Sequence, residues 1–115
     1  MAEAERQEIA ANAVSAVQKK IPEWIDVFSL CADETRMKIL VAVHAAPQSS
    51  VSQLAQATGL SANTVSQALA TLHKAGVVQV EQDGRFRRWR LEHPEVHRLL
   101  HQVDAPHSAL HPHHH

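Results

Sequence analysis

Residues 51–76 read VSQLAQATGLSANTVSQALATLHKAG, and their pattern is the strongest indication of the fold. Apolar residues recur in it at helical spacing in two short runs, and Gly59 stands between the runs. Ser61 is placed to cap the second run, and Gly76 is placed to end it. The residues expected to face the core are Val51, Leu54, Ala55, Val65, Leu69 and Leu72. Two short helices joined by a tight turn with glycine are typical of a helix-turn-helix.

The next residues, 77–91, read VVQVEQDGRFRRWRL and change the period from helical to two. Val77, Val78 and Val80 predict a strand, and Arg85 to Leu91 predict the returning strand. Asp83 and Gly84 between them are a strong signal for a hairpin turn. A hairpin that directly follows a helix-turn-helix predicts a winged helix-turn-helix fold.

Helical patterns lie on both sides of this motif. Ile9, Ala13, Val14, Val17 and Ile21 recur at steps of three or four, and we expect Pro22 to end this helix. The apolar stripe fits either a dimer surface or packing on the chain's own domain. A second helical block runs from Trp24 to Val43, in one or two pieces. Pro94 begins a last helix that carries Val96, Leu99, Leu100 and Val103.

We therefore predict a mostly α fold with a β-hairpin wing: four helices, two strands and a fifth helix. The DNA-binding and dimerisation domain is expected over residues 1–105. Pro106 and Pro112 argue against a longer helix, so residues 106–115 are expected to form a flexible, histidine-rich tail.

Length and composition limit the class of protein. A chain of 115 residues with 44% hydrophobic residues is one domain that can form its own core. Its one cysteine, Cys31, excludes an intramolecular disulfide and a CxxC site. No apolar run approaches the roughly 18 residues of a membrane span, and no signal-peptide pattern follows Met1. We expect a cytoplasmic protein with no membrane partner.

The formal net charge of -1 hides a segregation of charge along the chain. Residues 36–90 carry seven Lys and Arg against two Asp and Glu, while the segments on both sides are acidic. A nucleic-acid footprint is a local field rather than a total, so the near-neutral sum does not exclude nucleic acid.

Two groups of residues are candidates for binding double-stranded DNA. The second helix of the motif is expected to expose short hydrogen-bonding side chains, which suit a major groove: Ser61, Asn63, Thr64, Ser66, Gln67, Thr71 and Lys74. The wing carries four arginines that phosphates or a minor groove would neutralise: Arg85, Arg87, Arg88 and Arg90. The alternatives are a solvated helix face and arginines paired with acidic residues of the N-terminal helix.

The residues also resemble a known family. Residues 31–36, CADETR, followed by Met37 to Leu40, resemble the "LADPTR…IL" signature of the ArsR/SmtB family of dimeric winged-helix repressors. Residues 51–55 and 61–76 resemble its "vseLA…s.vSqHL..L..aGlV" motif, and the likeness covers about residues 24–103. The resemblance implies a homodimer formed by the first and last helices, an inverted-repeat operator, and release from DNA by a metal or another inducer.

The resemblance does not by itself identify the effector. The family's thiolate metal site would fall at Ser50 and Ser52, so it is absent here. Cys31 fits either a core position or, less simply, a soft-metal ligand. A second family site on the last helix matches only in part, at His93 and Glu95, and its later pair falls near Pro106 and Ala109.

Eight of the ten histidines lie between His93 and His115. On the last helix, His93, His97, His101 and Asp104 follow at steps of four, four and three, and His107 comes soon after. Imidazole and carboxylate ligands without thiolate suit nickel, cobalt or zinc, so we take these five residues as candidate metal ligands. The alternative is a solvated histidine face beside a tail that is either native or left from an added tag.

The sequence thus predicts a sequence-specific DNA-binding transcriptional regulator, a repressor of ArsR/SmtB type that responds to nickel, cobalt or zinc. The alternatives are a DNA-binding regulator with another effector or partner protein, and a metal-handling or interaction module. An enzyme is not expected, because the chain shows no nucleophile paired with a base and no glycine-rich phosphate loop.

Overall fold

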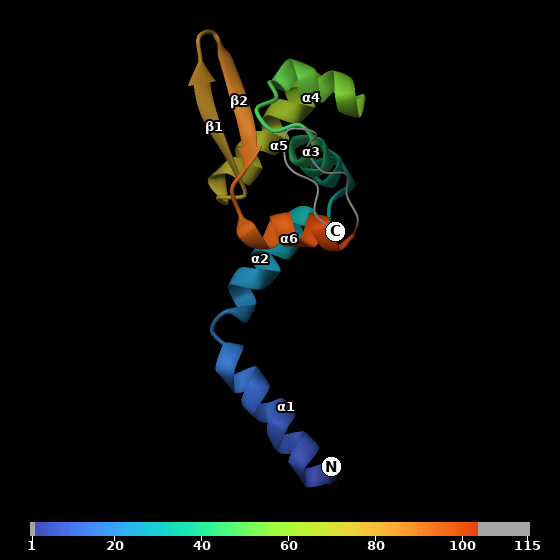
Figure 1. The fold of residues 1–115 in the computed structure, drawn as a ribbon, viewed down its shortest axis with the longest axis vertical. Helices are drawn as coiled ribbons and strands as arrows, with labels where there is room; N and C mark the ends of the chain where they lie inside the picture. Colours follow the sequence, from blue (N-terminus) through green and yellow to red (C-terminus); the bar gives the residue numbers. More distant parts are fainter. Residues whose placement is uncertain (1, 104–115) are drawn as a thin grey trace.

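The structure is a computed structural model that describes residues 2–103. Its elements, in chain order, are α1 (Glu3–Val17), α2 (Ile21–Cys31), α3 (Glu34–Ala45), α4 (Val51–Thr58), α5 (Ala62–Lys74), β1 (Val78–Asp83), β2 (Phe86–Leu91) and α6 (Pro94–Gln102) (Figure 1). The predicted mostly helical fold with a two-stranded wing is confirmed. The predicted tail and two candidate ligands, Asp104 and His107, lie outside the described residues.

The part of the chain that the structure describes has six helices, one more than predicted. The second helical block divides because Asp33 caps a new helix, and its carboxylate accepts a hydrogen bond from the backbone N–H of Arg36 at 2.9 Å. The prediction that Pro22 ends the first helix was wrong. That helix ends at Val17, and Pro22 lies in the first turn of α2, where its missing N–H has no helical partner to lose.

The helix-turn-helix forms as predicted from α4 and α5. Ser50 and Gln53 make a reciprocal capping box at the start of α4, and Gly59 ends that helix with a φ of 74°. Ser61 caps α5 by accepting from the backbone N–H of Thr64 at 3.0 Å. These local hydrogen bonds fix where both helices begin and end.

The wing is an antiparallel pair of β1 and β2 whose register runs from Val78↔Leu91 to Asp83↔Phe86. The loop is therefore Gly84 and Arg85, one residue later than the predicted Asp83–Gly84 pair. Gly84 takes a φ of 62° at the first loop position, which suits a tight hairpin. Trp89 ties the wing to the loop before α4. Its backbone N–H donates to Ser49 at 3.0 Å, and its carbonyl accepts from Gln48 at 2.8 Å.

The core lies between α2, α3, α4, α5, α6 and the base of the wing. Its buried apolar side chains are Val27, Cys31, Ile39, Leu40, Val43, Leu54, Val65, Leu69, Leu72, Val77, Val78, Trp89, Val96 and Leu100. None of the residues of α1 is buried, and α1 projects from the end opposite the wing (Figure 1). The radius of gyration of 17.7 Å accordingly exceeds the roughly 13 Å of a compact chain of this length.

Among residues 2–103, no helix is both long and apolar enough to cross a membrane.

Candidate nucleic-acid interface and histidine cluster

The outer face of α5 is set by its inner face. Val65, Leu69 and Leu72 are completely buried, and this orients the opposite side of the helix toward solvent. The exposed residues on that side are Asn63, Ser66, Gln67, Ala70, Thr71 and Lys74. The helix thus presents a continuous polar surface of short side chains.

The structure divides the predicted residues of α5 into two groups. The hydroxyl of Ser61 donates to that of Thr64 at 2.9 Å, and the hydroxyl of Thr71 donates to the carbonyl of Gln67 at 3.2 Å. These three hydroxyls already stabilise the helix. The side chains of Asn63, Ser66, Gln67 and Lys74 take part in no hydrogen bond within the described residues, so they are available to a ligand.

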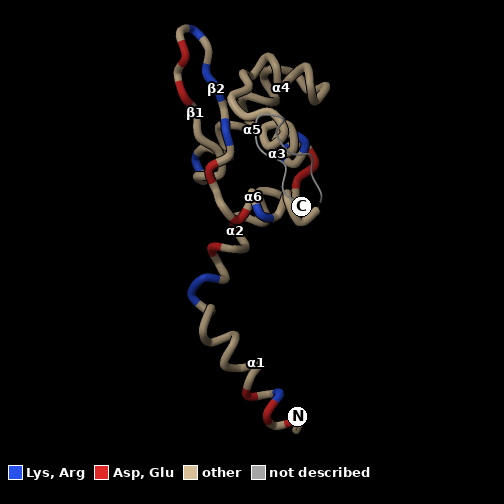
Figure 2. Tube along the Cα trace, in the orientation of Figure 1, with Lys and Arg blue, Asp and Glu red and all other residues tan. Residues whose placement is uncertain are grey.

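The wing arginines also fall into two groups. Arg88 pairs with Asp83 at 3.2 Å, and Arg90 pairs with Glu92 at 3.8 Å, so their acidic partners lie on or next to the hairpin and not on α1. Arg85 and Arg87 are exposed, and neither has an acidic partner among residues 2–103. Figure 2 shows the basic residues along β2 at the end of the molecule far from α1.

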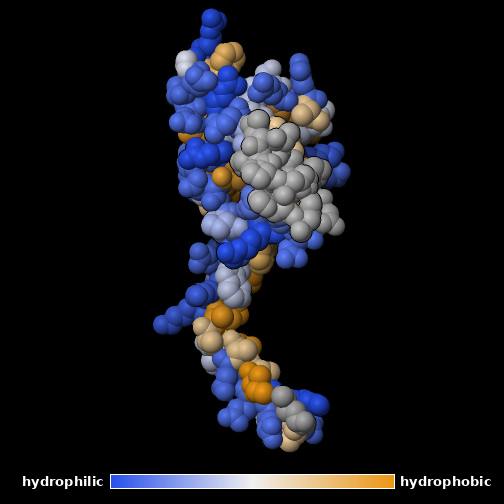
Figure 3. Space-filling view, in the orientation of Figure 1, coloured by the Kyte–Doolittle hydropathy of each residue, from blue (hydrophilic) through white to orange (hydrophobic). Residues whose placement is uncertain are grey.

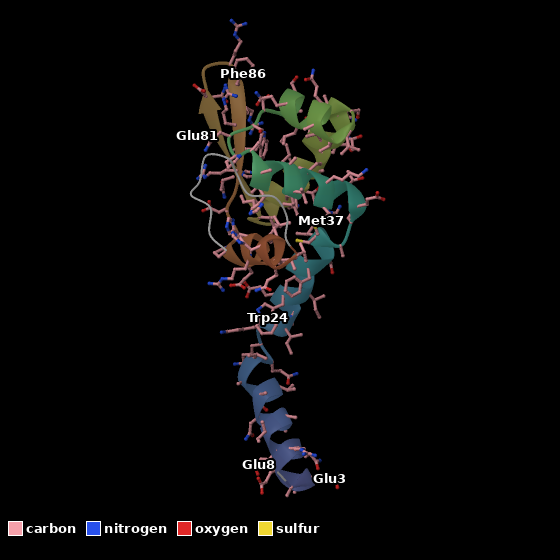
Figure 4. The ribbon with its side chains drawn as sticks, turned by 45° about the vertical axis from the view of Figure 1, so that its right-hand side comes forward. Glu3, Glu8, Trp24, Met37, Glu81 and Phe86 are labelled. Carbon is pink, nitrogen blue, oxygen red and sulfur yellow. The ribbon has the colours of Figure 1, made fainter. Side chains whose placement is uncertain are left out.

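Aromatic rings fix the direction of two of these arginines. The guanidinium of Arg87 lies 5.4 Å from the ring centre of Trp89, which is buried, and that of Arg88 lies 5.1 Å from Phe86. Phe86 is 51% exposed near the tip of the wing (Figure 4). Stacking on a ring keeps a guanidinium extended and oriented.

His73 is a residue of this surface that sequence reasoning missed. It lies exposed in the last turn of α5, with its ring edge-on to Trp89 at 6.0 Å between centroids. It therefore links the helix to the wing. The sequence holds no signal for this contact, because it joins two elements whose relative position depends on packing.

A cluster of three imidazoles lies where α3 meets α6. His44 comes from the last turn of α3 and is 4% exposed, while His97 is exposed and His101 is half-buried on α6. One ligand nitrogen from each lies within 4.8 Å of the others. The structure thus has a histidine cluster that can hold a metal ion.

The cluster shares His97 and His101 with the predicted ligand set and differs from it in the other members. His93 does not belong to it and instead caps α6, where its Nδ1 accepts from the backbone N–H of Glu95 at 3.2 Å. His44 was missed because it lies in an apolar helix far from the other histidines in sequence. The positions of Asp104 and His107 lie outside the described residues.

Cys31 is buried in the core at 3% exposure. Burial raises the pKa of its thiol, and the nearby positive charge of Arg36 opposes that shift only in part. The thiol is therefore neutral at neutral pH, which agrees with a core position and disfavours a soft-metal ligand.

Comparison with known proteins gives matches to this architecture. Residues 33–79 match the family described as "Winged helix-turn-helix DNA-binding". The chain is 38% identical over 87 residues to the HTH-type transcriptional regulator KmtR of Mycobacterium tuberculosis, a stretch that covers 76% of this chain and 65% of that protein. The chain thus spans slightly less than two thirds of this relative's length.

Solved structures of other transcriptional regulators have a similar fold. The transcriptional regulator HlyU of Vibrio vulnificus CMCP6 is similar with a TM-score of 0.70 and 26% identity, over 79% of this chain and 97% of that one. The AntR antimony-specific transcriptional repressor is similar with a TM-score of 0.68 and 26% identity, over 72% of this chain and 75% of that one.

The described residues have the winged helix-turn-helix fold, and residues 33–79 match the DNA-binding family of that description. The relatives at the level of both sequence and structure are transcriptional regulators. More particularly, these likenesses agree with the resemblance of residues 24–103 to the ArsR/SmtB family.

Proposed function

We propose that this protein is a sequence-specific transcriptional repressor that binds double-stranded DNA in the cytoplasm and catalyses no reaction. The observation that carries the proposal is the exposed polar face of α5 beside a wing with two arginines, Arg85 and Arg87, that have no acidic partner in the described chain. A helix of short amides and hydroxyls fits a major groove, and arginines without acidic partners fit phosphates.

The residues of α5 and the wing have different roles in DNA binding. Asn63, Ser66 and Gln67 contact base edges, because their side chains are exposed and unengaged. Lys74 and the wing arginines contact phosphates on either side of the groove, or enter the minor groove at the wing tip. Ser61, Thr64 and Thr71 hold α5 in shape through the hydrogen bonds described above.

The repressor acts as a homodimer on an inverted-repeat operator. Support comes from apolar side chains left on the surface at the end opposite the wing: Ile9, Val14, Trp24, Ile25 and Phe28, each between 39% and 56% exposed (Figures 3 and 4). A groove of about 540 Å³ lies beside Trp24 and Phe28 and reaches His93 at the start of α6. A second copy that covers this surface would supply a second α5, one for each half of an inverted repeat.

A second part of the proposal is a response to nickel, cobalt or zinc through the last helix. The observation that favours it is the cluster that includes His97 and His101, two of the residues proposed from the sequence. Imidazole nitrogens without thiolate are typical ligands for these ions.

Binding to the DNA upstream of the protein's own gene tests the DNA-reading surface. We expect Gln67→Ala to weaken operator binding and to relax base preference at one position by about 1–3 kcal/mol. The matched control is Gln56→Ala, which removes an exposed glutamine from α4. Equal losses of operator affinity from both substitutions would show that α5 does not read the bases.

The wing is tested by salt dependence. Arg85→Ala and Arg87→Ala are each expected to weaken binding to all sequences and to reduce the slope of log affinity against log salt by about 1. Arg98→Ala is the control, because Arg98 lies on α6 and pairs with Glu95 at 2.8 Å. An unchanged slope in both wing variants would show that the wing does not touch phosphates.

A further inference from the structure

His44, His97 and His101 are brought together by the packing of α6 on α3 within one chain. Their ring centroids are 5.0 Å apart for His44 and His97, 5.6 Å for His44 and His101, and 4.9 Å for His97 and His101. The ring planes meet at 65°, 80° and 45°, so none of the three pairs is stacked face to face. Rings inclined in this way can direct one nitrogen each toward a common point.

We propose that these three histidines form an intrasubunit site for one divalent transition-metal ion, and that the ion regulates DNA binding by joining α6 to α3. The regulatory half of this inference rests on the DNA-binding function proposed above. The site differs from the predicted ligand set because it includes His44 and leaves His93 to its role as a helix cap.

The position of the cluster favours a cation. His44 lies in the last turn of α3 (Glu34–Ala45), and His101 lies in the last turn of α6 (Pro94–Gln102). Two of the three histidines therefore lie in the last turn of a helix, where carbonyl groups have no helical partner. Each end carries a partial negative charge that stabilises a positive ion nearby.

The three histidine nitrogens need to move only slightly toward one another to bind one ion. Three nitrogens that bind one zinc ion at about 2.0–2.1 Å in a tetrahedral site lie about 3.4 Å from one another. The nitrogens here lie within 4.8 Å of one another, so no pair needs to approach by more than about 1.4 Å. The exposed His97 and the half-buried His101 can make this movement by side-chain rotation, while buried His44 stays in place. Three imidazoles also leave one position for water or another ligand.

A short chain segment connects this site to the DNA-reading head. The residues after His44 form the loop that ends at Ser50, the N-cap of α4. Within that loop, the hydroxyl of Ser49 donates to the carbonyl of Ala46 at 2.7 Å, and Gln48 and Ser49 are hydrogen-bonded to Trp89 of β2. A shift of the end of α3 against α6 is thus passed directly to α4 and to the wing.

Metal titration of the full-length chain without DNA tests the site itself. Cobalt(II) is added while its visible absorption is recorded, and nickel and zinc affinities are measured by calorimetry. We expect one tightly bound ion per chain, with affinity reduced more than tenfold in His44→Gln and in His97→Gln. Because His97 is exposed, its substitution does not threaten the core, and circular dichroism checks that both variants are folded.

Two matched histidine substitutions serve as controls. His73→Gln and His93→Gln each remove an imidazole outside the cluster and should bind cobalt as the unchanged chain does. Wild-type affinity in a folded His97→Gln variant would overturn the site, as would loss of the ion from His93→Gln alone. The absence of any binding at micromolar metal would also overturn it.

The effect of the metal on DNA binding is measured separately from metal binding. Operator affinity is compared with and without saturating metal, and we expect a change of about fivefold or more that His97→Gln abolishes. The metal-free affinity alone tests the proposed function. An operator that binds the metal-free protein and the metal-loaded protein equally, at a site shown to be filled, would overturn the coupling and leave the DNA-binding function in place.

Discussion

Cys31 and His44 are two core side chains whose chemistry depends on what surrounds them. Cys31 is enclosed by apolar residues, so its neutral thiol is favoured and the pKa of the thiol is raised. His44 is as well buried, yet it faces two other imidazoles. The same degree of burial therefore makes one residue inert and the other a candidate ligand.

At this scale we predict that Cys31 reacts slowly with thiol reagents. At pH 7.5 its rate in the folded protein should be at least about 100-fold below its rate in denaturant, because burial both shields the sulfur and reduces the thiolate fraction. The rate should rise with pH as the raised pKa is approached. Absorbance with a disulfide reagent measures this, and exposed Ser52→Cys in a Cys31→Ala background is the control. Similar rates for the two cysteines would contradict the prediction.

At the scale of single elements, α4 shows how a short helix depends on its ends. It has eight residues, of which Leu54 alone is buried, so packing stabilises it less than it does a longer helix. Ser50 and Gln53 compensate by satisfying each other's backbone N–H groups at 2.9 and 3.3 Å. The loop before α4 also holds the wing, so this helix start organises two parts of the DNA-reading head.

We therefore expect Ser50→Ala to lower the free energy of unfolding by about 1 kcal/mol. Ser52→Ala removes the same hydroxyl from an exposed position of the same helix and should change stability by no more than about 0.5 kcal/mol. Urea denaturation followed by circular dichroism gives both values. A Ser50→Ala variant as stable as Ser52→Ala would show that the capping box does not stabilise α4.

At the scale of the whole molecule, the two ends differ in kind. The wing and α5 carry polar and basic groups, while α1 and α2 at the opposite end expose apolar ones (Figures 2 and 3). None of the residues of α1 is buried, although Ile9 and Val14 lie on its apolar stripe. A helix with an uncovered apolar stripe is stabilised by a partner, and a second copy of the chain is the partner proposed above.

The corresponding prediction concerns assembly. The protein should sediment as a dimer of twice 12.7 kDa, and Ile9→Glu with Val14→Glu should shift it toward monomer at micromolar concentration without changing the unfolding of the winged domain. Asn12→Glu with Ser15→Glu adds the same charge on another side of α1 and is the control. Analytical ultracentrifugation decides the question, and a monomer in the unchanged chain would remove the dimer from the proposed function.

The helix-turn-helix and the wing were predictable because their signals are local. The caps at Ser50 and Ser61, the glycine at Gly59 and the change of period after Gly76 each act within a few residues of the backbone that they shape. The errors also have local causes. Pro22 has two helical uses, at an end and in a first turn, and the sequence pattern does not separate them.

The fold class and the polar face of α5 were predictable from the sequence, because periodicity and capping depend on neighbours along the chain. Which side chains from different elements meet depended on the tertiary structure. It placed His44 beside His97 and His101, made His93 a helix cap and set His73 against Trp89. Among residues 2–103 it also left Arg85 and Arg87 without the acidic partners that Arg88 and Arg90 have. These contacts join residues from different elements, and their distances follow from how α3, α5, α6 and the wing pack around a shared core.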